Sequence, residues 1–470
     1  MNRSTGRRDV LKTLGLGAVA TAITGKSVHA AESAAKNRVR GIVFLVSDGM
    51  SPGVLTIAEA YQQMHHRKST AWWKLLDNPS ASRGFMDTAS ANSLVTDSAA
   101  ASSAWGGGKR VKNGSINVAS DGSKMEPIMA LLKRKLDCRT GLVTTATTTH
   151  ATPAGFAAIA ASRSSEADIA TQYLQRVDVV LGGGSGYYDA KNRADRRDLR
   201  ADFEKAGYGI VRTREQLIAS RSSKLLGTFT SGHLPFTLDS RNHPNIARTV
   251  PSLSRMSRVA LERFLPGNQP FLLQIEGARI DHAAHLNDIA ALVADQLEFD
   301  RTLATVLEMT AAQPDVLVIV TSDHGNSNPG IVGMGGGYDQ STACFGRVAR
   351  MTASHERVFS EWSLGKDKSP AALGALISKQ LGFAPNPAEA EVLCDILARK
   401  NVVEWNHQLD KPEGLLGQIA GNHTGIGWSG TTHTSDPTII SAIGPQSQRF
   451  GGMIRNDSIF GHISELLGAA

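Results

Sequence analysis

Residues 43–50 read VFLVSDGM, and residues 316–325 read VLVIVTSDHG. In each stretch an apolar run leads, after one or two hydroxyl residues, to an aspartate. Fully buried parallel strands have this composition, and ligands of open α/β sheets gather at the carboxyl ends of such strands. One aspartate of this kind could simply cap a helix. Two of them, together with the acidic and histidine clusters described below, predict metal ligands at one edge of a sheet.

The rest of the chain alternates apolar runs of strand length with helical patterns, which favours a mostly parallel sheet covered on both faces. We therefore predict an α/β fold with a doubly wound sheet. The expected strands are 41–47, 140–146, 177–182, 270–276, 316–322 and 438–443. The expected helices are 54–64, 98–105, 125–135 and 285–311, the last with Asp288, Asp295, Glu298 and Arg301 toward solvent.

Between residues 326 and 430 the pattern loosens into glycine-rich and polar loops around two short amphipathic helices, near 370–381 and 387–399. We interpret this segment as an insertion near the entrance of the site, within one catalytic domain that spans residues 31–470.

The first 30 residues have the features of an export signal. Arg7 and Arg8 precede an apolar stretch, and small residues follow it before Ala31. This is the pattern of a twin-arginine signal peptide, and the apolar stretch is shorter than the roughly 20 residues that a membrane span needs. We expect a mature chain that starts near Ala31, has no membrane anchor and is periplasmic or secreted.

Composition limits the other function classes. Removing the signal would take away five basic residues and one acidic residue, so the formal charge would fall from +7 to +3. No dense basic stripe with interleaved aromatics is present, so we expect no nucleic-acid specificity. The three cysteines, Cys138, Cys344 and Cys394, are an odd number, so at least one stays unpaired in a monomer.

Residues 276–285, EGARIDHAAH, hold the densest group of candidate ligands. Glu276 closes a predicted strand, and Asp281 and His285 are four residues apart. If a helix has begun by then, both side chains lie on one face and can bind one cation, while Glu276 reaches another. An isolated pair at this spacing would more often be a surface helix pair, but so many ligands directly after a buried strand are uncommon by chance.

Further ligands come from Asp323 and His324 and from His433, which precedes the strand at 438–443. Mixed histidine and carboxylate sets suit zinc, whereas sets of oxygen ligands suit magnesium. The residues therefore fall into more than one predicted metal site.

Ser98 is the candidate nucleophile. It lies in the stretch TDSAAASSA, residues 96–104, at the start of a helix of small residues. The backbone N–H groups of that helix start would favour an anion. The segment alone is equally consistent with Asp97 or Ser98 acting only as a helix cap.

With these motifs together, the chain resembles the alkaline phosphatase family, from about residue 40 to residue 446 and most weakly across 326–430. The resemblance implies a doubly wound α/β fold, usually dimeric. It also implies hydrolysis of small phosphate monoesters through a phosphoserine intermediate, with two Zn²⁺ and one Mg²⁺.

The resemblance also implies individual roles. Asp281, His285 and His433 match the ligands of the first zinc, and Asp48, Ser98, Asp323 and His324 match those of the second. His433 is preferred to His423 because its distance to Gly444-Pro445 fits the family pattern.

Asp48 would bridge to the magnesium, whose other ligands match Thr152 and Glu276. Arg163 matches the arginine that holds two phosphate oxygens, oriented by Asp97. His150 and His282 stand where the best-known enterobacterial member has Asp and Lys, as in animal members. Because imidazole replaces an outer-sphere carboxylate there, the third site could take another metal.

Three alternatives remain at this stage. A phosphodiesterase of the same superfamily would use the same metals. A sulfatase would need a Cys or Ser followed by Pro and Arg, but Ser98 is followed by Ala99 and Ala100. A phosphate- or metal-binding export protein without turnover would keep the ligands but hydrolyse nothing.

Overall fold

The computed structural model describes residues 38–400 and 406–470. The predicted signal peptide, residues 1–30, lies outside the described residues.

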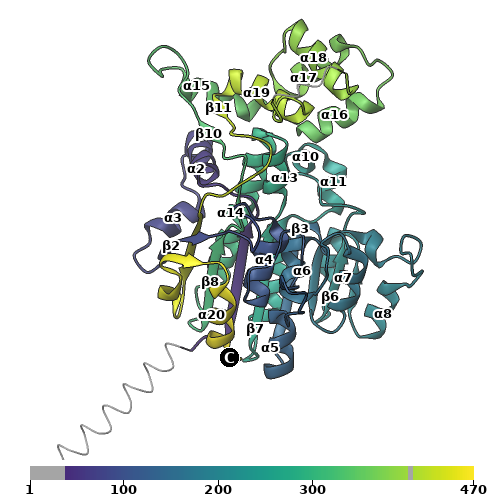
Figure 1. Ribbon diagram of the computed structural model, residues 1–470, viewed down its shortest axis with the longest axis vertical. Coiled ribbons are helices and arrows are strands. Elements are labelled where there is room, and N and C mark those ends of the chain that lie inside the picture. Colours follow the sequence, from purple (N-terminus) through teal and green to yellow (C-terminus); the bar gives the residue numbers. More distant parts are fainter. Residues whose placement is uncertain (1–37, 401–405) are drawn as a thin grey trace, which may run out of the picture.

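A ten-stranded sheet forms the centre of the molecule (Figure 1). In spatial order its strands are β14 (Gly452–Arg455), β2 (Ser82–Asp87), β13 (Thr438–Ile443), β8 (Val316–Thr321), β1 (Gly41–Ser47), β7 (Phe271–Gly277), β3 (Arg139–Thr147), β4 (Val179–Gly183), β6 (Leu225–Thr228) and β5 (Gly209–Val211). Strand β13 is antiparallel to both of its neighbours, and every other pairing is parallel. The predicted mostly parallel α/β fold is therefore confirmed.

Strand β1 shows why the sheet is covered on both faces. Its alternate side chains belong to two different cores, with Val43 and Leu45 in one and Ile42, Phe44 and Val46 in the other. Successive side chains of a strand point to opposite faces, so an unbroken apolar run requires helices on both sides.

One core is closed by helices α2 (Pro52–His66), α3 (Ala71–Asp77), α9 (Arg214–Ala219), α10 (Thr237–Asn242), α12 (Leu253–Phe264), α13 (Arg279–His285) and α14 (Ile289–Thr310), with α11 (Pro244–Thr249) packed on α10. The other is closed by α4 (Ser98–Gly107), α5 (Ile128–Leu136), α6 (Ala151–Ala157), α7 (Glu166–Tyr173), α8 (Leu199–Lys205) and α20 (Ser458–Leu467), with the short helices η1 (Ser185–Tyr188) and η3 (Ser447–Phe450). Helices α4 and α6 approach closely, since a Cβ on Gly106 would lie 2.0 Å from the Gly155 carbonyl oxygen.

The six predicted strands are all present within two residues of the expected bounds, but β2, β5, β6 and β14 were missed. Strand β2 is half exposed and carries Arg83, Gly84 and Asp87 within six residues. Strands β5 and β6 have three and four residues, too few for a periodic pattern.

The predicted helix 285–311 is wrong at its start. Helix α13 ends at His285 and α14 begins at Ile289, because the Asp288 side chain accepts hydrogen bonds from the N–H groups of Ala290 and Ala291 and caps the new helix. Asp288, Asp295 and Glu298 are also buried rather than solvent-facing, and only Arg301 is exposed.

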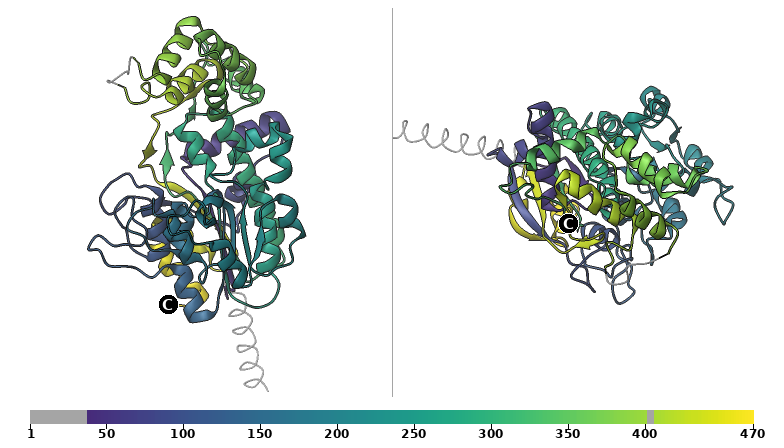
Figure 2. Two further views of the ribbon diagram at one scale, coloured as in Figure 1. Left: turned by 90° about the vertical axis from the view of Figure 1, so that its right-hand side faces the viewer. Right: turned by 90° about the horizontal axis from the view of Figure 1, so that it is seen from above.

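The segment 326–430 contains more structure than the two predicted helices. It includes β9 (Gly325–Asn326), β10 (Gly330–Ile331), α15 (Ser341–Phe345), η2 (Gly346–Arg350), α16 (His355–Leu364), α17 (Pro370–Leu381), α18 (Pro387–Leu397), α19 (Pro412–Thr424) and β11 (Ile426–Gly427). Strand β10 pairs with β11, and β9 pairs with β12 (His433–Thr434). Helices α15–α19 gather beyond the end of the sheet at which β1 finishes (Figures 1 and 2).

Within the described residues, every helix is too short or too polar to cross a lipid bilayer. The three cysteines are free thiols; Cys138 and Cys344 are buried, and Cys394 is half-buried.

Candidate metal centre

Three neighbouring strands deliver carboxylates to the same level of the sheet edge. Val46 of β1 pairs with Glu276 of β7 on one side and with Thr321 of β8 on the other. Asp48 and Asp323 each lie two residues beyond those paired positions. All three carboxylate residues have no exposed surface. The strand ends therefore concentrate negative charge where water cannot screen it.

The turn after β1 requires a glycine. Gly49 has φ +67°, and a Cβ at this position would lie 2.4 Å from Asp281 Oδ1. The Gly49 N–H donates to Asp323 Oδ1 at 3.0 Å. The DG pair at the end of β1 thus lets the chain turn while Asp281 approaches the strand ends.

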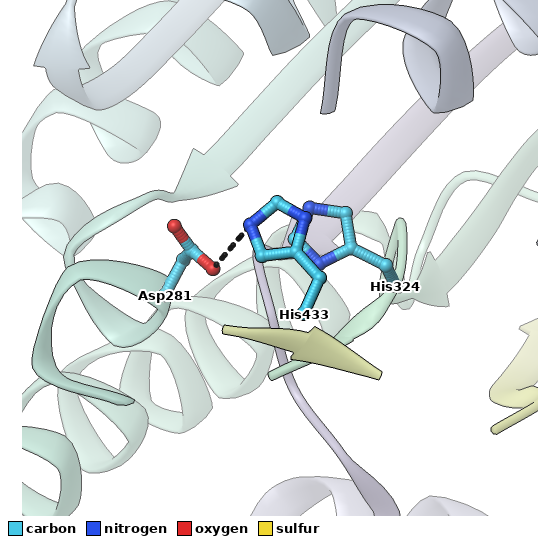
Figure 3. A group of neighbouring side chains, drawn as sticks. All are labelled: Asp281, His324 and His433. Carbon is cyan, nitrogen blue, oxygen red and sulfur yellow. Dashed lines mark ion pairs between the residues drawn. The ribbon is translucent and has the colours of Figure 1, made fainter. Parts of the chain in front are cut away.

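Helix α13 and strand β12 add histidines to this edge. His285 Nε2 lies 3.4 Å from Asp281 Oδ2, and His433 Nε2 lies 3.6 Å from Asp281 Oδ1. The two Nε2 atoms are 3.1 Å apart. Figure 3 shows Asp281 directed at the His433 ring, which stacks on His324 with centroids 3.7 Å apart.

His324 connects this group to Ser98 and to the strand ends. Its Nε2 lies 3.1 Å from Ser98 Oγ, 3.2 Å from Asp323 Oδ2 and 3.7 Å from Asp48 Oδ1. Two compact ligand groups result, one of Asp281, His324 and His433 and one of Asp48, Asp323 and His324. A third group joins Asp48 and Glu276 to His150.

The second nitrogen of each histidine fixes its tautomer. Nδ1 of His285, His324 and His433 faces the carbonyl oxygen of Thr431, Gly325 and Thr96, respectively, at 2.7, 3.2 and 2.9 Å. A carbonyl only accepts hydrogen bonds, so each Nδ1 carries the proton. With Nδ1 engaged in this way, Nε2 is the ring atom that faces the carboxylates, as in metal-binding histidines.

Several buried oxygens have no hydrogen-bond partner among the described residues: both carboxylate oxygens of Asp48, Glu276 Oε1, Asp323 Oδ2 and Thr152 Oγ1. An unpartnered buried acceptor is costly, and here the acceptors converge on one edge. Histidine nitrogens with carboxylates fit zinc, while the oxygen set of Asp48, Glu276 and Thr152 fits magnesium. The donor chemistry of the site therefore fits cations.

The acidity of these groups supports the same interpretation. Burial, followed by the charges of Asp323 and Asp281, raises the pKa of Asp48 well above its usual value. Burial raises the pKa of Glu276 to about 7 and that of Asp323 to about 6. Burial alone would lower the pKa of His285, but Asp281 raises it to about 9. The carboxylates need a compensating positive charge to ionise together.

Ser98 is the first residue of α4, and Asp97 caps that helix. Asp97 Oδ1 accepts from the Ala100 N–H at 2.9 Å, and Oδ2 accepts from Arg163 Nη1 at 3.0 Å. Asp97 therefore caps the helix and binds Arg163 at the same time. Arg163 Nη2 also donates to His150 Nε2 at 3.1 Å.

His150 lies beside Asp48 and Glu276, and His282 lies next to it, with ring centroids 5.8 Å apart. Burial and Arg163 hold the pKa of His150 well below its usual value, and burial and Arg279 do the same for His282. Arg279 Nη1 donates to His282 Nδ1 at 2.8 Å. Both histidines are therefore neutral imidazoles.

Sequence reasoning missed four residues that contact this site. Asn326 donates to Asp281 Oδ1 at 2.7 Å, and Thr144 donates to Glu276 Oε2 at 2.5 Å. Arg279 binds His282, and the His233 ring lies 4.5 Å from that of His282. Arg279, Thr144 and Asn326 lie in or beside motifs that the sequence does reveal, but nothing in the local pattern marks His233. His423, the alternative to His433, stacks on Phe383 instead.

Comparison with known proteins gives a consistent result. The family model described as "Alkaline phosphatase" matches residues 39–469. Alkaline phosphatase 3 of Bacillus subtilis is 27% identical, covering 92% of this chain and 90% of its own. Streptomycin-6-phosphate phosphatase of Streptomyces griseus is 32% identical, covering 61% and 74%. The crystal structure of Thermus thermophilus alkaline phosphatase superposes with a TM-score of 0.87 and 33% identity, covering 92% of each chain.

Proposed function

This chain belongs to the alkaline phosphatase family and is a metal-dependent hydrolase of phosphate monoesters, and we propose that it works through a phosphoserine formed on Ser98. The single observation that supports this most is the position of Ser98 Oγ, 3.1 Å from His324 Nε2 inside a ligand cluster and at a helix N-terminus. In this step Ser98 Oγ forms a bond to phosphorus while the ester oxygen leaves, and water later cleaves the phosphoserine.

We assign two Zn²⁺ and one Mg²⁺ to this centre, as the family resemblance implies. Asp281, His285 and His433 would hold the first zinc, and Asp48, Ser98, Asp323 and His324 the second. Asp48, Thr152 and Glu276 would hold magnesium, although His150 and His282 leave room for another metal there. These sets differ from the compact groups described above: His285 replaces His324 at the first zinc, Ser98 joins the second, and Thr152 replaces His150 at the magnesium. When bound, such ions lower the pKa of the serine and of water and stabilise the charge on the entering and leaving oxygens.

Arg163 would hold the phosphate. Its guanidinium offers a planar fork of donors that matches two phosphate oxygens. Asp97 and His150 each engage one of its terminal nitrogens. Asp97, fixed by the N–H groups of Ala100 and Gly114, therefore serves to aim this fork rather than to react.

The wider organisation is also proposed. Residues 31–470 would form one catalytic domain, with 326–430 as an insertion near the site entrance. Twin-arginine export through residues 1–30 would deliver the folded enzyme to the periplasm or beyond, where it would act as a homodimer. The Arg7-Arg8 pattern and the apolar stretch behind it support the export assignment, and the family resemblance supports the homodimer.

The decisive experiment compares Ser98→Ala with the parent enzyme on p-nitrophenyl phosphate, its bis-ester and the sulfate analogue, before and after metal removal and restoration. We expect dominant monoesterase activity that metal removal abolishes and zinc plus magnesium restore, and nearly complete loss in Ser98→Ala. Phosphate-labelled Ser98 in acid-quenched enzyme would identify the intermediate.

Activity of Ser98→Ala near that of the parent would refute the nucleophile assignment. Dominant bis-ester hydrolysis would instead support a phosphodiesterase, and metal-bound protein without any turnover would support a binding protein.

A further inference from the structure

Three imidazoles cluster on the magnesium side of the site. The rings of His150, His233 and His282 lie 4.5 to 5.8 Å apart. His150 is bonded to Arg163, which places the cluster next to the proposed phosphate fork. The three side chains come from the start of α6, from the loop between β6 and α10, and from α13.

Each of these imidazoles accepts a hydrogen bond from a group that can only donate. Arg163 Nη2 donates to His150 Nε2, and the Thr147 backbone N–H donates to His233 Nδ1, both at 3.1 Å. Arg279 Nη1 donates to His282 Nδ1 at 2.8 Å. A ring nitrogen that accepts a hydrogen bond carries no proton, and an imidazole keeps at least one, so the proton of each ring lies on its other nitrogen. For His282 that nitrogen is Nε2.

Arg279 is held in place independently of His282. Its side chain is 5% exposed and stacks on Phe236, with Cζ 3.7 Å from the ring centroid. Its Nη2 donates to Glu356 Oε2 at 2.7 Å. One guanidinium therefore spans from Glu356 to His282, with both terminal nitrogens engaged.

We propose that Arg279, held between Phe236 and Glu356, is a positioning residue that fixes His282 in the tautomer with its proton on Nε2, so that this N–H is available to a phosphate oxygen or to a water bound there. This inference deepens the proposed function and rests on it for the identity of the acceptor. A nitrogen that carries a proton cannot ligate a cation, so His282 would serve the phosphate and not the third metal.

The pair of Arg279 and Glu356 also connects the segment 326–430 to the site. Glu356 lies in the first turn of α16, which is anchored to the main body at its start. The Ser354 hydroxyl donates to Asp239 at 2.7 Å, and the His355 N–H donates to Asp288 at 2.6 Å. Because the start of α16 is fixed in this way, Glu356 stands at a defined distance from Arg279. Glu356, a residue of the segment 326–430, would thus affect the affinity for phosphate through Arg279.

The first test measures the tautomer directly. Two-bond ¹H–¹⁵N spectra of metal-loaded, ¹⁵N-histidine-labelled protein distinguish protonated from unprotonated ring nitrogens, and His282→Asn assigns the signals. We expect His282 to carry its proton on Nε2 in the parent, and Arg279→Met to give a mixture of tautomers. A proton on Nδ1 of His282 in the parent would overturn the inference.

The second test measures phosphate binding. We expect Arg279→Met to raise the inhibition constant of inorganic phosphate about five- to tenfold, the effect of roughly one lost hydrogen bond, with a smaller change in kcat. Arg279→Lys keeps the charge but has one ammonium for two partners, so it should recover only part of the affinity. Glu356→Gln removes only the ion pair between Glu356 and Arg279, at a side chain that is 57% exposed. This variant should fold normally and raise the inhibition constant of phosphate about twofold.

The matched control is Glu361→Gln. Glu361 lies on the same helix and pairs with Arg357 at 2.7 Å, with no contact to Arg279. It should leave both the tautomer and the phosphate inhibition unchanged. Unchanged spectra and inhibition in both Arg279→Met and Glu356→Gln would overturn the proposal. Because the spectra do not depend on turnover, a wrong tautomer in an active enzyme refutes this inference alone, whereas an active Ser98→Ala refutes the proposed nucleophile alone.

Discussion

At the scale of the residue, Arg163 is the side chain that we propose to bind the phosphate. Its Nη1 and Nη2 are aligned by Asp97 and His150, so the fork is preorganised for an oxyanion. We expect Arg163→Ala to raise the inhibition constant of phosphate about 10- to 100-fold, because bonds to charged groups contribute roughly 1.5–3 kcal/mol. Arg163→Lys should recover only part, since an ammonium lacks the planar fork. Steady-state inhibition by inorganic phosphate measures both.

The control for Arg163 is Arg134→Ala, which removes an exposed pair with Glu126 and should leave phosphate inhibition unchanged. Unaltered inhibition in Arg163→Ala would contradict the assignment.

The sequence could indicate Asp48, Glu276 and Asp323 because they lie beside strand ends. Ser98 was indicated by its place at the start of a small-residue helix, and Arg163 only by the family resemblance. The sequence could not indicate His233, because its proximity to the site arises from tertiary folding.

At the scale of the element, helix α14 contains a buried carboxylate, Asp295. Burial raises the pKa of Asp295 from 3.8 to about 7, even though both its oxygens accept hydrogen bonds from Thr237. Between these two pH values the folded state binds more protons than the unfolded state, so stability falls as pH rises through that window. We expect Asp295→Asn to remove this loss, raising stability at pH 9 relative to the parent by up to about 4 kcal/mol, at about 1.4 kcal/mol per pKa unit. Thermal unfolding at pH 5 and pH 9 measures the difference.

Asp300, one turn further along α14, gives the contrast. Its two oxygens accept from the backbone N–H groups of Ala71 and Trp72, and an amide cannot accept at both. Asp300→Asn should therefore destabilise the protein at both pH values, whereas Asp295→Asn can turn its amide toward the Thr237 hydroxyl. Equal pH dependence in Asp295→Asn and the parent would contradict the assignment.

The same helix marks the limit of prediction from periodicity. The spacing of Leu292, Phe299 and Leu303 identified the core-facing side of α14 correctly, since all three are buried. It did not reveal that Asp288 ends one helix and starts the next, nor that the acidic residues are buried as partners of other elements. Long apolar strands were predictable because the burial of both faces demands them, whereas β2 and the edge strand β14 depend on neighbours distant in sequence.

At the scale of the whole molecule, the candidate metal centre contains residues from segments near both ends of the chain. Asp48 follows β1, whereas His433 belongs to β12. Without cations, burial raises the pKa values of Asp48, Glu276 and Asp323, the last two to about 7 and 6. At pH 5 these carboxylates of the metal-free folded state therefore hold protons that a cation must displace, and at pH 9 they do not.

Bound cations replace those protons, so the stabilisation by metal should be larger at pH 9 than at pH 5. Calorimetry of dialysed metal-free protein, with and without zinc and magnesium at each pH, measures it as a difference in Tm. Two His-Thr pairs provide the matched variants: His433→Ala should lose part of the metal-dependent gain in Tm, whereas His423→Ala, which only frees Phe383 from its stacking partner, should retain it. An equal gain at both pH values, or equal behaviour of the two variants, would show that these buried carboxylates and His433 do not form the centre that fixes the two ends of the chain together.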